Sequence, residues 1–402
     1  MHSNDLQGRI PNGDRARLFS GARRIVVKVG TNVVAGPDGA VGVARLESIT
    51  DSLARLREKG LQVVLVSSGA VGLGRSRLGL HHARTHDLVT RQACAAVGQA
   101  LLMHEYEKFF SRHDVRIAQV LLTEDDFMDR RRSSNLRHTM EKLLKLGVVP
   151  VVNENDTVST AELEYAPGTG RARIFSDNDR LAALVASRLD ANALVLLTNV
   201  EGLLRSSRSL PAADGDSTLV PVVTEITPEV KALAAGPAVG GRGGMLTKLQ
   251  AAEIATHAGA IAVIADGAQP GILERIFQGD QVGTLFLPAA RMAGKRRWIA
   301  YAADVRGRVV VNPGARAAIV EGKASLLWSG VVEVQHRFKA MDVISIADSE
   351  GREFARGIAN HASDQAQAAA LGKARADKAS LAKSAVLVTR DNIVVLKNDD
   401  KS

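Results

Sequence analysis

The sequence predicts an α/β protein in which a mostly parallel β-sheet is sandwiched by helices, followed by a small, mostly-β domain. In the first 290 residues, short apolar β-branched runs alternate with longer stretches of helical spacing. Strands that are apolar throughout and separated by helices are typical of parallel sheets covered on both faces. From Arg291 onwards, short strands separated by turns rich in Gly, Asn and Pro replace this alternation.

The apolar runs predict seven strands in the first part: 24–29, 61–66, 115–122, 148–152, 193–197, 260–265 and 284–287. The spacing of apolar residues predicts helices between them: 43–59, 87–110, 135–146, 179–189 and 245–257. The glycine-rich segment 67–74, after the second strand, is predicted as a turn. Ligands of such sheets bind at the carboxyl ends of the strands, which is where this chain carries its unusual polar residues.

Length and charge indicate more than one domain. The 402 residues carry 52 Lys and Arg against 43 Asp and Glu, a net charge of +9. Residues 291–402 hold 19 basic and 12 acidic residues, or +7, which leaves +2 for the first 290. We therefore expect an N-terminal extension over 1–20, an α/β domain over 21–290, and a mostly-β domain with a C-terminal tail over 291–402.

Composition also excludes several classes of protein. A single cysteine, Cys94, excludes an internal disulfide framework and a metal cluster built from cysteines. The first 20 residues are polar, and no apolar run approaches 18 residues. These features argue against a secretory signal and a membrane span, and predict a cytoplasmic protein.

Two loops at predicted strand ends carry features suited to an anionic ligand. Lys28 lies inside an apolar strand, where a buried ammonium needs an anionic partner or a route to water. The Ser68–Gly69 turn after the second strand exposes backbone N–H groups that suit phosphate or carboxylate. Either feature alone is also compatible with an ordinary edge strand and an ordinary turn.

Three further segments are polar or glycine-rich. Asn153 to Asp156 follow the fourth strand, and suit either a polar ligand or a turn with a helix cap. Asn178 and Asp179 precede a helix, where such residues are common N-caps. Segment 240–244 is rich in glycine and opens the helix that contains Lys248, an arrangement that brings backbone N–H groups and a cation to phosphate. Neither a P-loop nor a G-x-G-x-x-G fingerprint is present.

The order and identity of these segments resemble the amino-acid kinase family. The segments that carry the resemblance are VVKVGT at 26–31, VSSGA at 66–70, RQACAAVGQ at 91–99, AQVLLT at 118–123, PVVNEND at 150–156, DNDRLA at 177–182 and GGMLTKLQAA at 243–252. Within the family, the match is to enzymes that phosphorylate the γ-carboxylate of L-glutamate with ATP, the first step of proline synthesis. Segment 306–360 resembles the PUA module that bacterial members often carry.

The resemblance implies a role for each matching residue. Lys28 and Lys248 would neutralise the transferring phosphoryl group, Asp179 would lie between them, and the N–H of Gly69 would assist. The glutamate pocket would comprise Ser68, Asp156 and Asn178, with Asn153 nearby. The nucleotide contacts would be Lys28, Thr198, Asn199, Arg242, Gly243, Gly244, Met245, Leu246, Thr247 and Lys248. Asn199 stands where the family usually has Asp, and Arg242 stands where it commonly has a small residue or Thr. Segment 203–220 also departs from the family pattern.

The resemblance also implies partners. Mg²⁺ would enter with ATP rather than on a protein site, proline would act as a feedback inhibitor, and the kinase domain would form homo-oligomers. Two alternatives stay open: another amino-acid kinase acting on acetylglutamate or aspartate, and an RNA-binding role centred on the basic PUA-like module.

Overall fold

A computed structural model describes residues 12–34, 42–80, 88–123, 125–158, 178–206, 217–234, 244–289, 294–302, 305–364 and 386–396. Most of the predicted N-terminal extension and much of the C-terminal tail lie outside these residues. Contacts divide the chain into two compact units, Met1–Arg291 and Met292–Ser402. Each unit has its own sheet.

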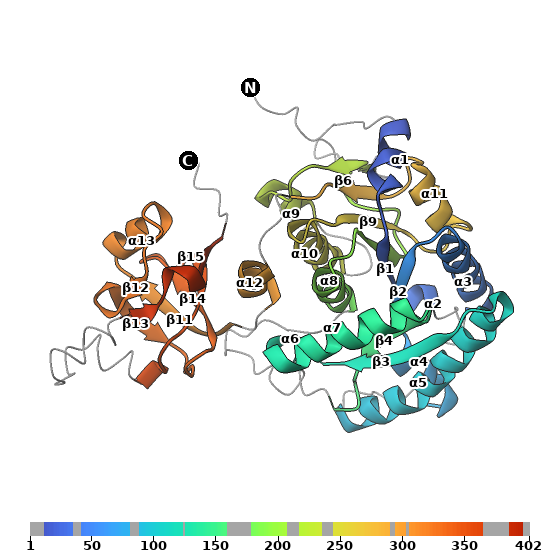
Figure 1. Cartoon of the computed structure of the whole chain (residues 1–402), viewed down its shortest axis with the longest axis horizontal. Coiled ribbons are helices and arrows are strands. Elements are labelled where there is room, and N and C mark those ends of the chain that lie inside the picture. The colour runs from blue at the N-terminus through green and yellow to red at the C-terminus, as the bar shows by residue number, and fades with distance from the viewer. Residues whose placement is uncertain are drawn as a thin grey trace. The chain divides into compact units, whose positions relative to one another are not determined.

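The first unit is built on an eight-stranded sheet with the order β3-β4-β2-β1-β5-β9-β10-β8 (Figure 1). Its strands are β1 Arg24–Val29, β2 Gln62–Ser67, β3 Ile117–Leu122, β4 Val149–Glu154, β5 Ala193–Thr198, β8 Val222–Val223, β9 Ile261–Asp266 and β10 Thr284–Phe286. Pairing is parallel except between β9 and β10. The mostly parallel sheet predicted from the apolar runs is confirmed; the two-residue strand β8 was not predicted. Strand β1 pairs with β2 on one side and with β5 on the other. Strands β2 to β4 lie on the first side, and the chain crosses to the second side after β4, so the switch point of the sheet lies at β1, where ligands of such folds bind.

Helices cover both faces of this sheet (Figure 1). Their bounds are α1 Asn12–Ser20, α2 Thr31–Val34, α3 Val43–Glu58, α4 Ala70–Arg77, α5 Leu88–Phe110, α6 Asp125–Met128, α7 Arg130–Lys145, α8 Asn178–Arg188, α9 Pro228–Leu233, α10 Gly244–His257 and α11 Ile272–Gln278. Ile25, Val27 and Val29 of β1 share one core with residues of α3, α5 and α11. Because side chains alternate along a strand, Val26 and Lys28 point to the opposite face, where α8 contacts β1.

The predicted helix 135–146 was too short. Helix α7 begins at Arg130, five residues earlier. The carboxylate of Asp129 accepts hydrogen bonds from the backbone N–H groups of Arg131 and Arg132, as a helix cap does. The first turn of α7 is rich in arginine and has no periodically spaced apolar residues. The spacing of apolar residues therefore could not locate the start of the helix.

The prediction of a turn over 67–74 was wrong for most of the segment. Only Ser68 and Gly69 form the turn, and α4 starts at Ala70. Gly74 lies within α4, and this position requires glycine because a Cβ there would lie 1.8 Å from the carbonyl oxygen of Cys94 on α5. Gly98 on α5 is equally confined, since a Cβ would lie 1.7 Å from the carbonyl oxygen of Ala70. These two glycines mark a close backbone crossing of α4 and α5 rather than a loop.

This crossing predicts opposite outcomes for two glycine-to-alanine changes. Gly98→Ala must push α4 away from α5, and we expect a loss of about 1–3 kcal/mol in the free energy of unfolding. Gly72→Ala on α4 is the matched control, because a Cβ there meets nothing within 4 Å. It should be neutral or add up to about 1 kcal/mol through helix propensity. Urea denaturation of the two variants measures both effects, and equal stabilities would contradict the crossing.

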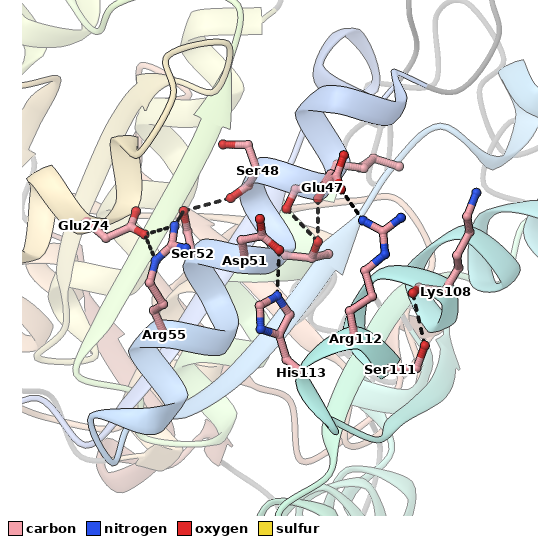
Figure 2. Close-up of polar contacts among 12 residues, drawn as sticks. Glu47, Ser48, Asp51, Ser52, Arg55, Lys108, Ser111, Arg112, His113 and Glu274 are labelled. Carbon is pink, nitrogen blue, oxygen red and sulfur yellow. Dashed lines mark hydrogen bonds and ion pairs between the residues drawn. The ribbon is translucent and has the colours of Figure 1, made fainter.

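A polar network joins α3 to its neighbours at the surface (Figure 2). Nε of Arg55 donates to Glu274 on α11 at 2.7 Å, and Nε2 of His113 lies 2.7 Å from the Asp51 carboxylate. Arg112 pairs with Glu47. These side chains are partly exposed, so each pair contributes at most about 1 kcal/mol and the apolar core holds the helices.

The second unit contains a five-stranded sheet with the order β13-β11-β14-β15-β17. Its strands are β11 Val305–Val311, β13 Val331–Gln335, β14 Val343–Ala347, β15 Glu353–Ile358 and β17 Ile393–Val395, while β12 Leu326–Leu327 pairs with β16 Val386–Val388. Helix α13, Pro313–Val320, is capped by Asn312, whose side chain accepts from the N–H of Ala315. The small mostly-β domain predicted after Arg291 is confirmed. None of the helices in the described residues is both long and apolar enough to cross a membrane.

Candidate active site

Lys28 lies on β1, on the face of the sheet that α8 and α10 cover. Its side chain is only 3% exposed, although it is a cation among apolar strand residues. Its ammonium lies 2.7 Å from Oδ1 of Asp179, the second residue of α8. The anionic partner that the strand pattern required is therefore supplied by a helix that begins far away in the sequence.

Asp179 is shared with a second lysine. Nζ of Lys248, one turn into α10, donates to Oδ2 of Asp179 at 2.9 Å and to the carbonyl oxygen of Gly244 at 3.1 Å. Asp179 is fully buried and Lys248 is 8% exposed. One carboxylate thus lies between two ammonium groups, with one oxygen facing each.

This lysine–aspartate–lysine group (Lys28, Asp179 and Lys248) carries two positive charges and one negative charge. A net positive charge in a buried site is costly unless an anion compensates it. Elements at the carboxyl end of β1 and the first turn of α10 surround the group, so the anion would enter at the switch point of the sheet. The arrangement suits a phosphoryl group, whose negatively charged oxygens would lie beside the two ammonium groups.

A chain of buried amides lies at the ends of β2 and β4. Nδ2 of Asn178 lies 2.9 Å from both Oγ of Ser68 and Oδ1 of Asn153, and 3.1 Å from the carbonyl oxygen of Ser67. Asn153 in turn donates from Nδ2 to Oε1 of Gln99 at 2.8 Å. The structure therefore brings Ser68, Asn153 and Asn178 together, and places Asn178 next in the chain to Asp179 of the charged group.

Gly69 closes the turn that follows β2. Its φ of 103° lies in the left-handed region, and a Cβ there would meet the side chain of Val34 at 2.9 Å. Glycine is required for both reasons. The turn directs the first N–H groups of α4 toward the carboxyl edge of the sheet, as expected for an anion-binding loop.

Asp156 lies in the loop after β4 and is half-buried. Burial raises the pKa of its carboxyl, and the positive charge of Arg91 opposes that rise. A partly buried carboxylate suits a cationic ligand group such as an ammonium.

The predicted nucleotide residues fall in two places. Thr198 and Asn199 follow β5, where Oγ1 of Thr198 lies 3.3 Å from Oδ1 of Asn199. Gly244, Met245, Leu246 and Thr247 form the first turn of α10, and Leu246 is exposed. Arg242 and Gly243 lie outside the described residues. Strand β5 is adjacent to β1, and the N–H of Gly30 donates to the carbonyl oxygen of Leu197 at 3.0 Å, so both strand ends lie at one edge.

Among the described residues, no group of three or more His, Cys, Asp or Glu side chains is arranged to hold a metal ion. The charged group instead presents cations.

Comparison with known proteins identifies the family of this chain. The profile of the Amino acid kinase family matches residues 23–265, more than half of the chain. The chain belongs to the amino acid kinase family. The PUA domain profile matches residues 307–381.

Two relatives in this family match most of the chain. Glutamate 5-kinase of Moorella thermoacetica is 45% identical over 387 residues, which cover 94% of this chain and 97% of that protein. Glutamate 5-kinase of Myxococcus xanthus is 46% identical over 84% of this chain and 86% of that protein. Among solved structures, a UMP kinase from Bacillus anthracis is similar with a TM-score of 0.45 and 16% identity, over 67% of this chain and 97% of that chain.

The sequence analysis did not assign Gln99 to the site. Gln99 is 8% exposed and reaches Asn153 from the middle of α5. Two signals were available: Gln99 is a single amide in the apolar run AAVGQALL at 95–102, and it ends segment 91–99, which carries part of the family resemblance. A lone polar residue on a buried helix face needs a partner, but only the fold shows that the partner is Asn153.

Proposed function

We propose that this protein is a glutamate 5-kinase, which transfers the γ-phosphoryl group of ATP to the γ-carboxylate of L-glutamate in the first step of proline biosynthesis. The observation that carries the proposal is the buried lysine–aspartate–lysine group beside hydrogen-bonded amide side chains at the switch point of the sheet. Relatives named glutamate 5-kinase that match over most of the chain support the choice of substrate.

The chemistry requires no general base. The side-chain carboxyl of glutamate has a reference pKa of about 4.3 and is ionised at neutral pH. One carboxylate oxygen attacks the γ-phosphorus, a new O–P bond forms, and the bond between that phosphorus and the oxygen bridging to the β-phosphate breaks. The products are γ-glutamyl phosphate and ADP, and no proton moves.

The obstacle is repulsion between a carboxylate and polyphosphate. Phosphoryl transfer is catalysed mainly by positioning and by stabilising charge on the transferred group. Lys28 and Lys248 supply two ammonium groups, held apart and aimed by the two oxygens of Asp179. The N–H of Gly69 offers a further donor to the phosphoryl oxygens.

Glutamate would be bound by the amides and by Asp156. Ser68 and Asn153 would present a hydroxyl and an amide group to the carboxylates, and Asp156 and the side-chain oxygen of Asn178 would face the substrate ammonium. ATP would bind with Mg²⁺ at Thr198, Asn199 and residues 242–248, and the metal would be held by the phosphates. Inhibition by proline, assembly of homo-oligomers through the kinase domain and a cytoplasmic location belong to the same proposal.

The decisive test compares acceptors. Purified protein with Mg·ATP and hydroxylamine should form γ-glutamyl hydroxamate from L-glutamate, because hydroxylamine traps the acyl phosphate. Aspartate and acetylglutamate serve as alternative acceptors in parallel reactions. A signal with either of these and none with glutamate would overturn the proposal in favour of another amino-acid kinase.

Asp156→Asn tests the ammonium partner. The change keeps the shape of the side chain and removes its charge, so KM for glutamate should rise at least about tenfold, as for loss of a charge-assisted hydrogen bond. KM for ATP should change little, because the phosphates contact other residues. Steady-state kinetics with each substrate varied gives both values, and a selective rise in KM for ATP would contradict the assignment.

A further inference from the structure

Three hydrogen-bonded amide side chains, those of Gln99, Asn153 and Asn178, lie near the ends of β2 and β4. One backbone group determines their orientation. The N–H of Glu154 donates to Oδ1 of Asn153 at 2.9 Å. An amide oxygen must therefore face that N–H, and Nδ2 of Asn153 must point the other way, toward Gln99. Gln99 consequently presents Oε1 to Asn153, which fixes its own orientation.

The same reasoning fixes Asn178. Its Nδ2 faces three acceptors, the carbonyl oxygen of Ser67, Oγ of Ser68 and Oδ1 of Asn153. Only a donor fits that position, so Oδ1 of Asn178 points away from all three. The orientation of all three amide side chains therefore follows from hydrogen-bond chemistry.

This arrangement uses all but one donor group and one acceptor group of these amides. Nε2 of Gln99 and Oδ1 of Asn178 are buried, and neither has a hydrogen-bond partner in the described part of the chain. Buried polar groups without partners are rare, and each is costly unless a ligand or water completes it. Two such atoms on one fixed amide chain, of opposite hydrogen-bonding character, point to a ligand that has both an acceptor and a donor.

We propose that Gln99 is a further substrate-binding residue, whose Nε2 donates a hydrogen bond to a carboxylate oxygen of bound glutamate. Oδ1 of Asn178 accepts from the ammonium of the same molecule, and Gln99 also positions Asn153 through its Oε1. The inference rests on the proposed function for the identity of the ligand. It adds a residue from α5 to a site whose other members come from the sheet edge and α8.

Gln99→Glu separates the two tasks of this side chain. The new carboxylate keeps an oxygen that accepts from Asn153, but it replaces the free donor by an anion facing the substrate carboxylate. We expect KM for glutamate to rise at least tenfold, with KM for ATP within twofold of wild type. Binding of L-glutamate measured by calorimetry should weaken by the same factor.

The pH dependence gives a readout that a purely structural role would not produce. When the introduced carboxyl is protonated it becomes a donor again, so the ratio of variant to wild-type KM for glutamate should fall as the pH is lowered. A ratio that is independent of pH, or a KM for glutamate within twofold of wild type, would overturn the inference.

Two controls keep the result interpretable. Ala100→Glu adds the same charge to an exposed position of α5 and should leave both KM values unchanged. If Gln99→Glu does not fold, Gln99→Met decides by the same measurement, because it removes the donor without adding charge; an unchanged KM for glutamate would reject the inference. Wild-type protein that forms no γ-glutamyl hydroxamate would instead refute the proposed function, so the two failures are distinct.

Discussion

Lys248→Ala is expected to lower kcat at least about 10²-fold, the usual effect of removing one donor that stabilises charge in the transition state. Nζ of Lys248 is the buried cation that contacts both Asp179 and Gly244 at the start of α10. Removing it leaves Lys28 as the remaining ammonium of the group. Because the lost interaction strengthens as charge develops on the phosphoryl group, kcat should fall much more than KM for glutamate rises.

Lys231→Ala is the matched control. Lys231 on α9 pairs with Glu253 on α10 at 3.0 Å, but its side chain is 39% exposed and lies outside the charged group. Its loss should leave kcat within about twofold of wild type, as expected for a surface ion pair. Turnover near wild type in Lys248→Ala would remove Lys248 from the mechanism.

Asp179→Asn is expected to reduce stability as well as activity. The change preserves the volume of the side chain but leaves two buried ammonium groups without their shared carboxylate. Breaking a buried ion pair by removing one partner costs about 3–5 kcal/mol, and the loss should appear as a lower midpoint in urea denaturation. Asp51→Asn, at the half-exposed pair with His113, provides the comparison and should cost less than about 1 kcal/mol.

A second substitution identifies the cause of that loss. Adding Lys28→Met to Asp179→Asn removes one of the two buried cations that lose the Asp179 carboxylate, so the double variant should be more stable than Asp179→Asn alone. Such non-additivity is typical of residues in contact. Independent, additive losses would show that Asp179 is held by other contacts and does not act as the shared partner.

The sequence predicted the parallel sheet because its buried strands are continuous apolar runs, and the structure places them within two residues of the expected bounds. It also placed Lys28, Asp179 and Lys248 at element ends that a parallel sheet brings to one edge. Segment 67–74 was read incorrectly because glycine is a turn signal and also a means of close helix contact. Only the approach of α5 to Gly74 distinguishes the two.

The pairing of side chains could not be predicted to the same extent. Nothing in the sequence near Gln99 indicates that it bonds to Asn153, 54 positions away. The orientation of these amide side chains depends on the backbone N–H of Glu154. Almost every residue has a backbone N–H, so this group leaves no signal in the sequence. Information of this kind resides in tertiary contacts, so residues that complete a binding site from a covering helix are missed more easily than those in strand-end loops.

The most direct test of the account follows the transferred oxygen. Glutamate labelled with ¹⁸O in its γ-carboxylate is incubated with the protein, Mg·ATP and hydroxylamine, and the released phosphate is analysed by mass spectrometry. Attack of the carboxylate on the γ-phosphorus places a labelled oxygen in the acyl phosphate bridge, and hydroxylamine then attacks the carbonyl carbon and releases that oxygen with the phosphate. The account predicts phosphate carrying one ¹⁸O in amounts equal to the hydroxamate formed. Unlabelled phosphate, formed at the same rate without glutamate, would contradict it.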